Sequence, residues 1–156
     1  MTPIFRWTVV RWILLGLLLI LVAMQFVPID QVNPPVVAEV PASAPVRAIL
    51  RRACYDCHSN ETVWPWYSHI APLSWLLVRD VQEGRAELNF SLWNQYSTKK
   101  QVKKLQKSWK EVQTGDMPPW YYLPVHRHAR LSVEDRAALH TWALSTAAAP
   151  AGKSDQ

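Results

Sequence analysis

The chain has 156 residues, of which 49% are hydrophobic, and a formal net charge of +5, which suits one small domain with accessory segments. Nine Trp and twelve Pro against four Gly exclude a largely disordered chain, because so many bulky aromatic residues indicate a packed body. Arg6 and Arg11 carry part of the positive charge, and the mild excess in the remainder fits an acidic partner or a lipid surface only weakly.

A hydrophobic run at residues 12–27 follows these two arginines and, extended back to Trp7, reaches the roughly twenty residues of a bilayer-spanning helix. Arginines before the run keep that end in the cytoplasm. No A-x-A cleavage site follows, so residues 1–27 are expected to be an uncleaved signal anchor, with a cleaved signal peptide as the alternative. We expect a single-pass protein of a bacterial inner membrane with its carboxy-terminal domain in the periplasm. Residues 28–44, rich in Pro and Val, predict an extended tether.

Residues 54–58 read Cys-Tyr-Asp-Cys-His, the C-x-x-C-H pattern of c-type haem attachment, and contain the only two cysteines. Two thiols at this spacing add to the vinyl groups of one porphyrin edge, and the next imidazole then lies under the iron. The pattern predicts one covalent haem c, with Cys54 and Cys57 as thioether attachment points and His58 as proximal iron ligand. A helix capped by Ser43 is expected to lead into this motif.

An aromatic, proline-rich loop at residues 60–72 follows the motif. Its Trp and Tyr rings can cover a porphyrin edge and bond its propionates, or they can simply fill the core of a small domain. Residues 73–83 predict a second helix that ends at Gly84, a residue suited to left-handed helix termination. Phe90 and Trp93 are expected in the core.

A third helix is predicted between a cap at Ser97 or Thr98 and a stop at Gly115, with one apolar face. Six lysines fall on the opposite face, within an arc of roughly 140°. They are Lys99, Lys100, Lys103, Lys104, Lys107 and Lys110. This lysine face, in particular Lys99, Lys103, Lys107 and Lys110, can dock an acidic redox protein or rest on anionic lipid, and an ordinary solvated face is the alternative. Nucleic acid is a poor partner for an exported domain.

The loop after the third helix contains Met117, the only methionine outside the hydrophobic run, followed by two prolines. A thioether is a soft ligand that raises the reduction potential of a haem, so Met117 is predicted to be the distal iron ligand opposite His58. A packing role is one alternative for Met117. His126 is the alternative distal ligand and would give bis-histidine ligation with a lower potential.

A last helix is expected over residues 133–147, with Ser132 as its cap and carboxylates in its first turn. Residues 148–156 are expected to be a disordered tail. No internal repeat and no strand pattern occur. The residues therefore predict an all-α domain with long loops at 45–147, preceded by one transmembrane helix.

Several stretches of this sequence also form a recognisable set. They are CYDCHSNET, WPWYS, IAPLSW, EGR with ELNFSLW, and a series that begins with MPPW, and together they cover about residues 48–142. The set resembles the haem-binding domain family of small membrane-anchored bacterial c-type proteins. The resemblance implies a cytochrome-c-like helical fold with one haem, attached at Cys54, Cys57 and His58, and supports Met117 or His126 as functional positions. It implies no settled reaction.

The function that these features favour is a membrane-anchored monohaem cytochrome that carries electrons and catalyses no reaction of its own. The alternative is a haem peroxidase or ligand sensor with an open or labile distal position, for which His126 or His128 would supply the distal group. A thiol–disulfide oxidoreductase fits poorly, because its cysteine pair normally begins a helix beside a sheet. A zinc site would need a fourth ligand that the motif does not supply.

Overall fold

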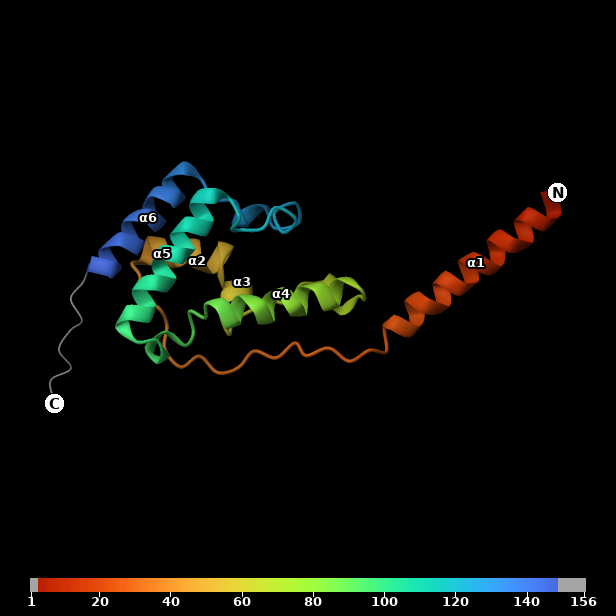
Figure 1. The fold of residues 1–156 in the computed structure, drawn as a ribbon, viewed down its shortest axis with the longest axis horizontal. Coiled ribbons are helices and arrows are strands. Elements are labelled where there is room, and N and C mark those ends of the chain that lie inside the picture. The colour runs from red at the N-terminus through yellow and green to blue at the C-terminus, as the bar shows by residue number, and fades with distance from the viewer. Residues whose placement is uncertain (1–2, 149–156) are drawn as a thin grey trace. The chain divides into compact units, whose positions relative to one another are not determined.

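The computed structural model describes residues 3–148, and the chain divides into two compact units. The first unit comprises residues up to 32 together with 64–80, and the second comprises 33–63 and the residues from 81 onward. The helices in chain order are α1 (Pro3–Met24), α2 (Ala44–Ala53), α3 (Tyr55–His58), α4 (Leu73–Glu87), α5 (Thr98–Thr114) and α6 (Val133–Ala148) (Figure 1). Short 3-10 turns lie at Trp66–His69, Trp93–Gln95 and Arg127–Ala129. No strand occurs in the described part of the chain, and the predicted all-α class is confirmed.

Helix α1 contains an apolar stretch, Trp7–Met24, that is long enough to cross a membrane. None of this stretch is buried inside the protein. Because each Å² of apolar surface left in water is unfavourable by about 25 cal/mol, such a helix needs an apolar surrounding. Its length, composition and place near the amino terminus fit a membrane span or a signal sequence.

The core of the second unit brings α2, α5 and α6 together around the segment that follows α4. Phe90 and Trp93 are 2% and 4% exposed and stack with ring centroids 6.4 Å apart, as core residues should. Leu105 of α5 is fully buried, and Trp142 of α6 is 8% exposed. Burying each such side chain stabilises the fold by roughly 1.5–3 kcal/mol.

The ends of α5 and α6 lie where their sequence signals predict. Gly115 ends α5 in the left-handed conformation, with φ 85°, a value at which a side chain would be strained. At the start of α6, the Ser132 N–H donates to Asp135 Oδ2 at 2.8 Å, and the Asp135 N–H donates to Ser132 Oγ at 3.1 Å. This reciprocal pair satisfies backbone donors that the first turn leaves open. The expected tail lies outside the described residues apart from Ala148.

The predicted end of the second helix at Gly84 is wrong, because α4 continues through Gly84 to Glu87. A Cβ atom placed on Gly84 would lie 2.5 Å from the carbonyl oxygen of Cys57 and 3.1 Å from its Cβ. No side chain fits there unless the backbone moves. This position therefore needs glycine because α4 meets the backbone of the haem motif, and not because the helix ends.

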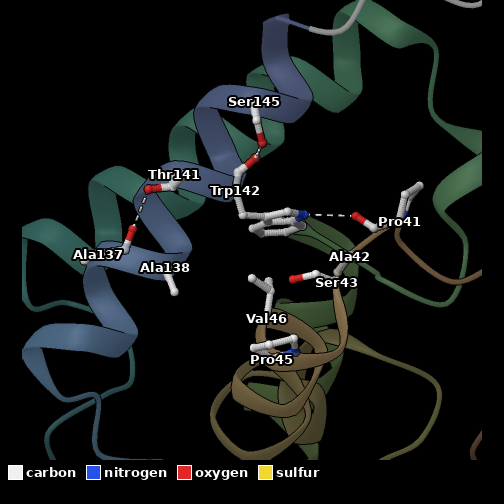
Figure 2. A pocket seen from close by; sticks show the side chains of 10 residues that line it. All are labelled: Pro41, Ala42, Ser43, Pro45, Val46, Ala137, Ala138, Thr141, Trp142 and Ser145. Atoms are coloured by element: carbon white, nitrogen blue, oxygen red, sulfur yellow. Dashed lines mark hydrogen bonds between the residues drawn. The ribbon is translucent and has the colours of Figure 1, made fainter.

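Residues 28–43 contain no helix or strand, and from residue 33 onward they belong to the second unit and pack within it. Val40 is 2% exposed and belongs to the core, and the Ala38 N–H donates to the Ser91 carbonyl at 3.0 Å. The Trp142 indole N–H donates to the carbonyl of Pro41 at 2.9 Å, beside an open pocket between α6 and the start of α2 (Figure 2). Residues of this segment thus complete the packing of α2 and α6.

Arg52, near the end of α2, fixes the helix that leads into the motif. Its guanidinium donates to the carbonyls of His128 and Arg130, at 2.6 and 2.9 Å, and pairs with the carboxylate of Asp135. The hydrogen bond from Arg52 holds the pKa of Asp135 below its ordinary value. One side chain therefore joins α2 to the segment before α6 and to the first turn of α6.

Replacing Arg52 with Gln should lower the stability of the protein at neutral pH. It should also reduce the further loss of stability at acid pH. Because the folded-state pKa of Asp135 is depressed, its contribution is present above the unfolded pKa of about 3.9 and is lost as pH falls through the lower folded value. We expect R52Q to lose about 1 kcal/mol at neutral pH, since the pair is partly exposed, and to lose less stability than the wild type on acidification. Denaturant titrations at neutral and acid pH measure both effects.

The matched control is R47Q, since the Arg47 guanidinium lies 3.8 Å from Glu39 and is half exposed. The R47Q variant should lose almost no stability, because an exposed ion pair contributes little. An equal loss in R47Q, or an unchanged acid dependence in R52Q, would contradict the role given to Arg52.

Candidate functional site

The predicted haem motif lies at the junction of two helices. Cys54 follows α2, donating its N–H to the Leu50 carbonyl at 2.8 Å, and its φ of −128° breaks the helix before α3 begins at Tyr55. Cys57 and His58 then lie on the single turn of α3. Both cysteines are partly buried and are not joined in a disulfide. The break thus places two thiols and one imidazole on a short, well-defined stretch of backbone.

The His58 ring is held in the orientation and tautomer of a metal ligand. Its Nδ1 lies 2.9 Å from the carbonyl of Gly84 and 3.1 Å from that of Leu88. Carbonyls only accept hydrogen bonds, so Nδ1 carries the proton and the lone pair is on Nε2. Burial lowers the pKa of His58, which keeps the ring neutral at pH 7. Neutral imidazole is the form that binds a metal.

Helix α4 supports the motif through Gly84, by the carbonyl of this residue and by its lack of a side chain. The Gly84 carbonyl accepts the bond from His58, and the bare Cα of Gly84 lets the helix pack on the backbone of Cys57. Beyond the end of α4 at Glu87, the Phe90 N–H donates to the carbonyl of His58 at 2.8 Å. Residues 84–90 therefore fix the orientation of the His58 ring, the backbone of Cys57 and His58, and the distance between α3 and α4.

Buried polar side chains fix the backbone that follows the motif. They are Ser59, Asn60, Thr62, Asn89 and Ser91. Asn89 Nδ2 donates to Asn60 Oδ1 at 2.8 Å, and the Thr62 hydroxyl donates to the Asp56 carbonyl at 2.7 Å. A buried polar group left without a partner costs about 1–3 kcal/mol, so such a network holds one geometry. The sequence pattern did not reveal this role, and its only signal is the run of small polar residues after His58.

A second support joins the motif to the loop before α6. The Tyr122 hydroxyl donates to Asp56 Oδ2 at 2.6 Å. The Tyr122 ring stacks on the ring of His126, with centroids 3.8 Å apart and planes within 7°. The loop that carries His126 is therefore tied directly to the residue between the two cysteines.

The comparison with known families agrees with this geometry. A family model described as haem-binding domain matches residues 19–145. The chain belongs to the haem-binding domain family. No curated protein and no solved structure matches it. Haem is thus the cofactor that the family assigns to the domain. The residues to compare with what a haem requires are those around Cys54–His58.

The donor set of this haem-binding domain fits a haem. Within residues 3–148, no group of three or more His, Cys, Asp or Glu side chains is placed to hold a metal ion. A zinc site needs such a group, whereas a porphyrin supplies four nitrogens and asks the protein only for axial ligands. His58 has the tautomer for that role, and a thiol is a group that can add to a vinyl substituent of a porphyrin.

The Cys54 thiol differs from the reactive thiol of a thiol–disulfide oxidoreductase. Burial, with Cys57 as the next cause, raises the pKa of Cys54 to about 12. Thiol–disulfide oxidoreductases instead depend on a cysteine whose pKa is lowered, commonly at the start of a helix. The high pKa and the absence of a sheet in the described residues both disfavour that function.

Met117 and His126, the two predicted distal ligands, lie in different surroundings. Met117 is partly buried against the core of the second unit, and its N–H donates to the Glu111 carbonyl at 3.1 Å. His126 has its Nδ1 3.2 Å from the Tyr122 carbonyl, and its ring meets that of His128 edge-on, with centroids 5.8 Å apart. A carbonyl on Nδ1 directs the lone pair to Nε2, as in His58. The choice between the two stays a prediction.

Substituting Gly84 with Ala should impair the site although alanine favours helices. Alanine gains about 1 kcal/mol in helix propensity, but the contact with Cys57 forces overpacking that costs about 1–3 kcal/mol. We expect G84A to incorporate less haem and to unfold at lower denaturant concentration, measured by absorbance and titration. The control is G16A, because a Cβ on Gly16 meets nothing within 4 Å. Normal haem content in G84A would show that α4 is not a support.

Proposed function

We propose that the protein is a membrane-anchored monohaem c-type cytochrome that transfers electrons on the periplasmic side of the inner membrane. The observation that carries the proposal is the double carbonyl contact to His58 Nδ1, next to two thiols at haem-attachment spacing. Cys54 and Cys57 would each add across one vinyl group of the porphyrin, with the sulfur bonded to one carbon and the hydrogen retained on the other. His58 Nε2 would be the proximal ligand.

The haem supplies the one-electron chemistry, and the residues of this chain hold it and keep its surroundings constant. The fixed backbone of residues 54–62 limits movement when the charge on the iron changes. Met117 is proposed to close the distal position, because a soft thioether stabilises the reduced state. An iron with two protein ligands has no open position for a substrate, which favours a carrier over a peroxidase or sensor.

The membrane and partner assignments follow from charge. Arg6 and Arg11 lie in the amino-terminal half of α1, and no Lys or Arg follows before Arg47, which fits an anchor with its amino end in the cytoplasm. On the lysine face, Lys107 pairs with Glu87 at 2.6 Å, and Lys104 lies over the ring of Tyr96 at 4.8 Å. Other members remain exposed and would dock an acidic redox partner by electrostatic attraction.

Haem made covalent by the motif should survive denaturation. We expect the full chain, produced with haem-attachment machinery, to keep its haem on a denaturing gel, because thioether bonds persist when the fold is lost. C54S and C57S should each retain one bond and show a red-shifted reduced pyridine-complex spectrum, since one vinyl group stays intact. The double variant should lose the haem on denaturation. Retention by the double variant would refute covalent attachment while leaving haem binding itself intact.

The distal ligand can be assigned from single substitutions. We expect M117A to lose the low-spin ferrous spectrum, to bind carbon monoxide and to show a lower reduction potential, since a ligand that stabilises ferrous iron is gone. H126A and the control H128A should keep the wild-type spectrum.

If H126A instead abolishes the low-spin spectrum and M117A leaves it unchanged, the ligand is His126. Strong carbon monoxide binding or peroxide turnover by the wild type would favour the peroxidase or sensor.

A further inference from the structure

The stretches of chain that make up the first unit are almost free of charged residues. No Asp, Glu, Lys or Arg occurs between Glu61 and Arg79, or between Arg11 and Asp30. The stretches that make up the first unit, residues up to 32 and 64–80, are therefore nearly free of charge. All the lysines of the chain lie in the second unit. A water-facing domain surface normally has charges of both signs along such a length of chain.

The segment before α4 is hydrogen-bonded to the residues that directly follow α1. The Ala71 N–H donates to Gln25 Oε1 at 3.1 Å, and Gln25 Nε2 donates to the Ala71 carbonyl at 3.2 Å. Gln31 Nε2 donates to the carbonyl of Ser68 at 2.5 Å. Because Gln25 comes one residue after the end of α1, these bonds hold the segment at the level where a spanning helix leaves the hydrocarbon.

Large apolar side chains are exposed on this same segment. Trp66 is 76% exposed, and Phe26, next to Gln25, is 81% exposed. Ile70, Leu73 and Leu76 are also exposed, at 44%, 49% and 45%. A set of this kind marks an interaction surface, because soluble monomers seldom leave apolar side chains grouped in water. Its Trp and Tyr content is typical of the boundary between lipid headgroups and acyl chains.

We propose that Phe26 and residues 66–76 form an interfacial surface that rests on the headgroup–acyl boundary of the bilayer crossed by α1. The proposal rests on the membrane anchoring under Proposed function. A lipid partner is favoured over a protein because the surface has no charges to specify a protein and is continuous with the end of α1. The domain is then held at the membrane by a second contact besides its single helix.

Photo-crosslinking to lipid tests this surface in the full, haem-loaded chain. Vesicles of phosphatidylethanolamine and phosphatidylglycerol would carry a lipid with a photoactivatable diazirine near the top of its acyl chain. Peptide mass spectrometry then locates the crosslinks. We expect them in α1, at Phe26 and within residues 66–76, and few around Trp120, which is 80% exposed but belongs to the charged second unit.

Two substitutions provide a matched pair. W66E should reduce labelling of residues 66–76 several-fold while α1 stays labelled, because a carboxylate at the boundary is unfavourable. W120E, a change at an equally exposed Trp, should leave this labelling unchanged.

Crosslinks confined to α1, or equal labelling around Trp120, would overturn the interfacial surface. A covering of residues 66–76 by haem or by another protein would give the first of these results. Loss of labelling in α1 itself would instead refute the anchor, and absorbance of the same sample reports haem attachment independently of both.

Discussion

The approach of helix α4 to the Cys-Tyr-Asp-Cys-His turn is the constraint on which the rest of the site depends. With no Cβ on Gly84, two backbones come close enough for the Gly84 carbonyl to reach His58 Nδ1. The same approach brings the Leu88 carbonyl to that nitrogen. Ring orientation and tautomer of His58 are thus consequences of one helix contact. A larger residue at position 84 would disturb both together.

Around this contact, the protein uses hydrogen bonds between buried polar groups in addition to apolar packing. The residues after the motif pair with each other and with Asn89 and Ser91, which keeps the turn of α3 in one position. A rigid first coordination sphere is what an electron carrier requires, because any rearrangement on reduction adds to the barrier for transfer. The apolar core made by α5 and α6 stabilises the domain without taking part in this network of hydrogen bonds.

Much of this arrangement could be predicted from local sequence signals, and the rest depends on contacts between distant segments. The caps at Ser132 and Gly115 and the helical periods are patterns within a few residues, and the structure places α5 and α6 where they indicate. Gly84 was misread because a glycine near a helix end has the same local pattern whether it terminates the helix or admits a neighbouring backbone. The pairing of Tyr122 with Asp56 spans 66 residues and has no local signature.

The segment 33–42 shows the same limit. Its prolines and valines predict an extended backbone, which is correct, but extended backbone can be a spacer or an added layer of the domain. Whether such a segment packs depends on the partners it meets, here Ser91 and Trp142. A short peptide with buried Val40 has little freedom to act as a linker.

Met117 and His126 lie nine residues apart on one proline-rich loop, and they would give the iron different properties. A sulfur ligand needs no preset proton position, and binding through Met117 would give up some of its packing against the core. His126 has its tautomer already set by the Tyr122 carbonyl, but Tyr122 also ties it to Asp56, within the motif itself. Binding through His126 would therefore couple the distal ligand to the proximal turn through one tyrosine. Binding through Met117 would leave the two sides of the haem independent, which suits a carrier whose potential must stay constant as its partners change.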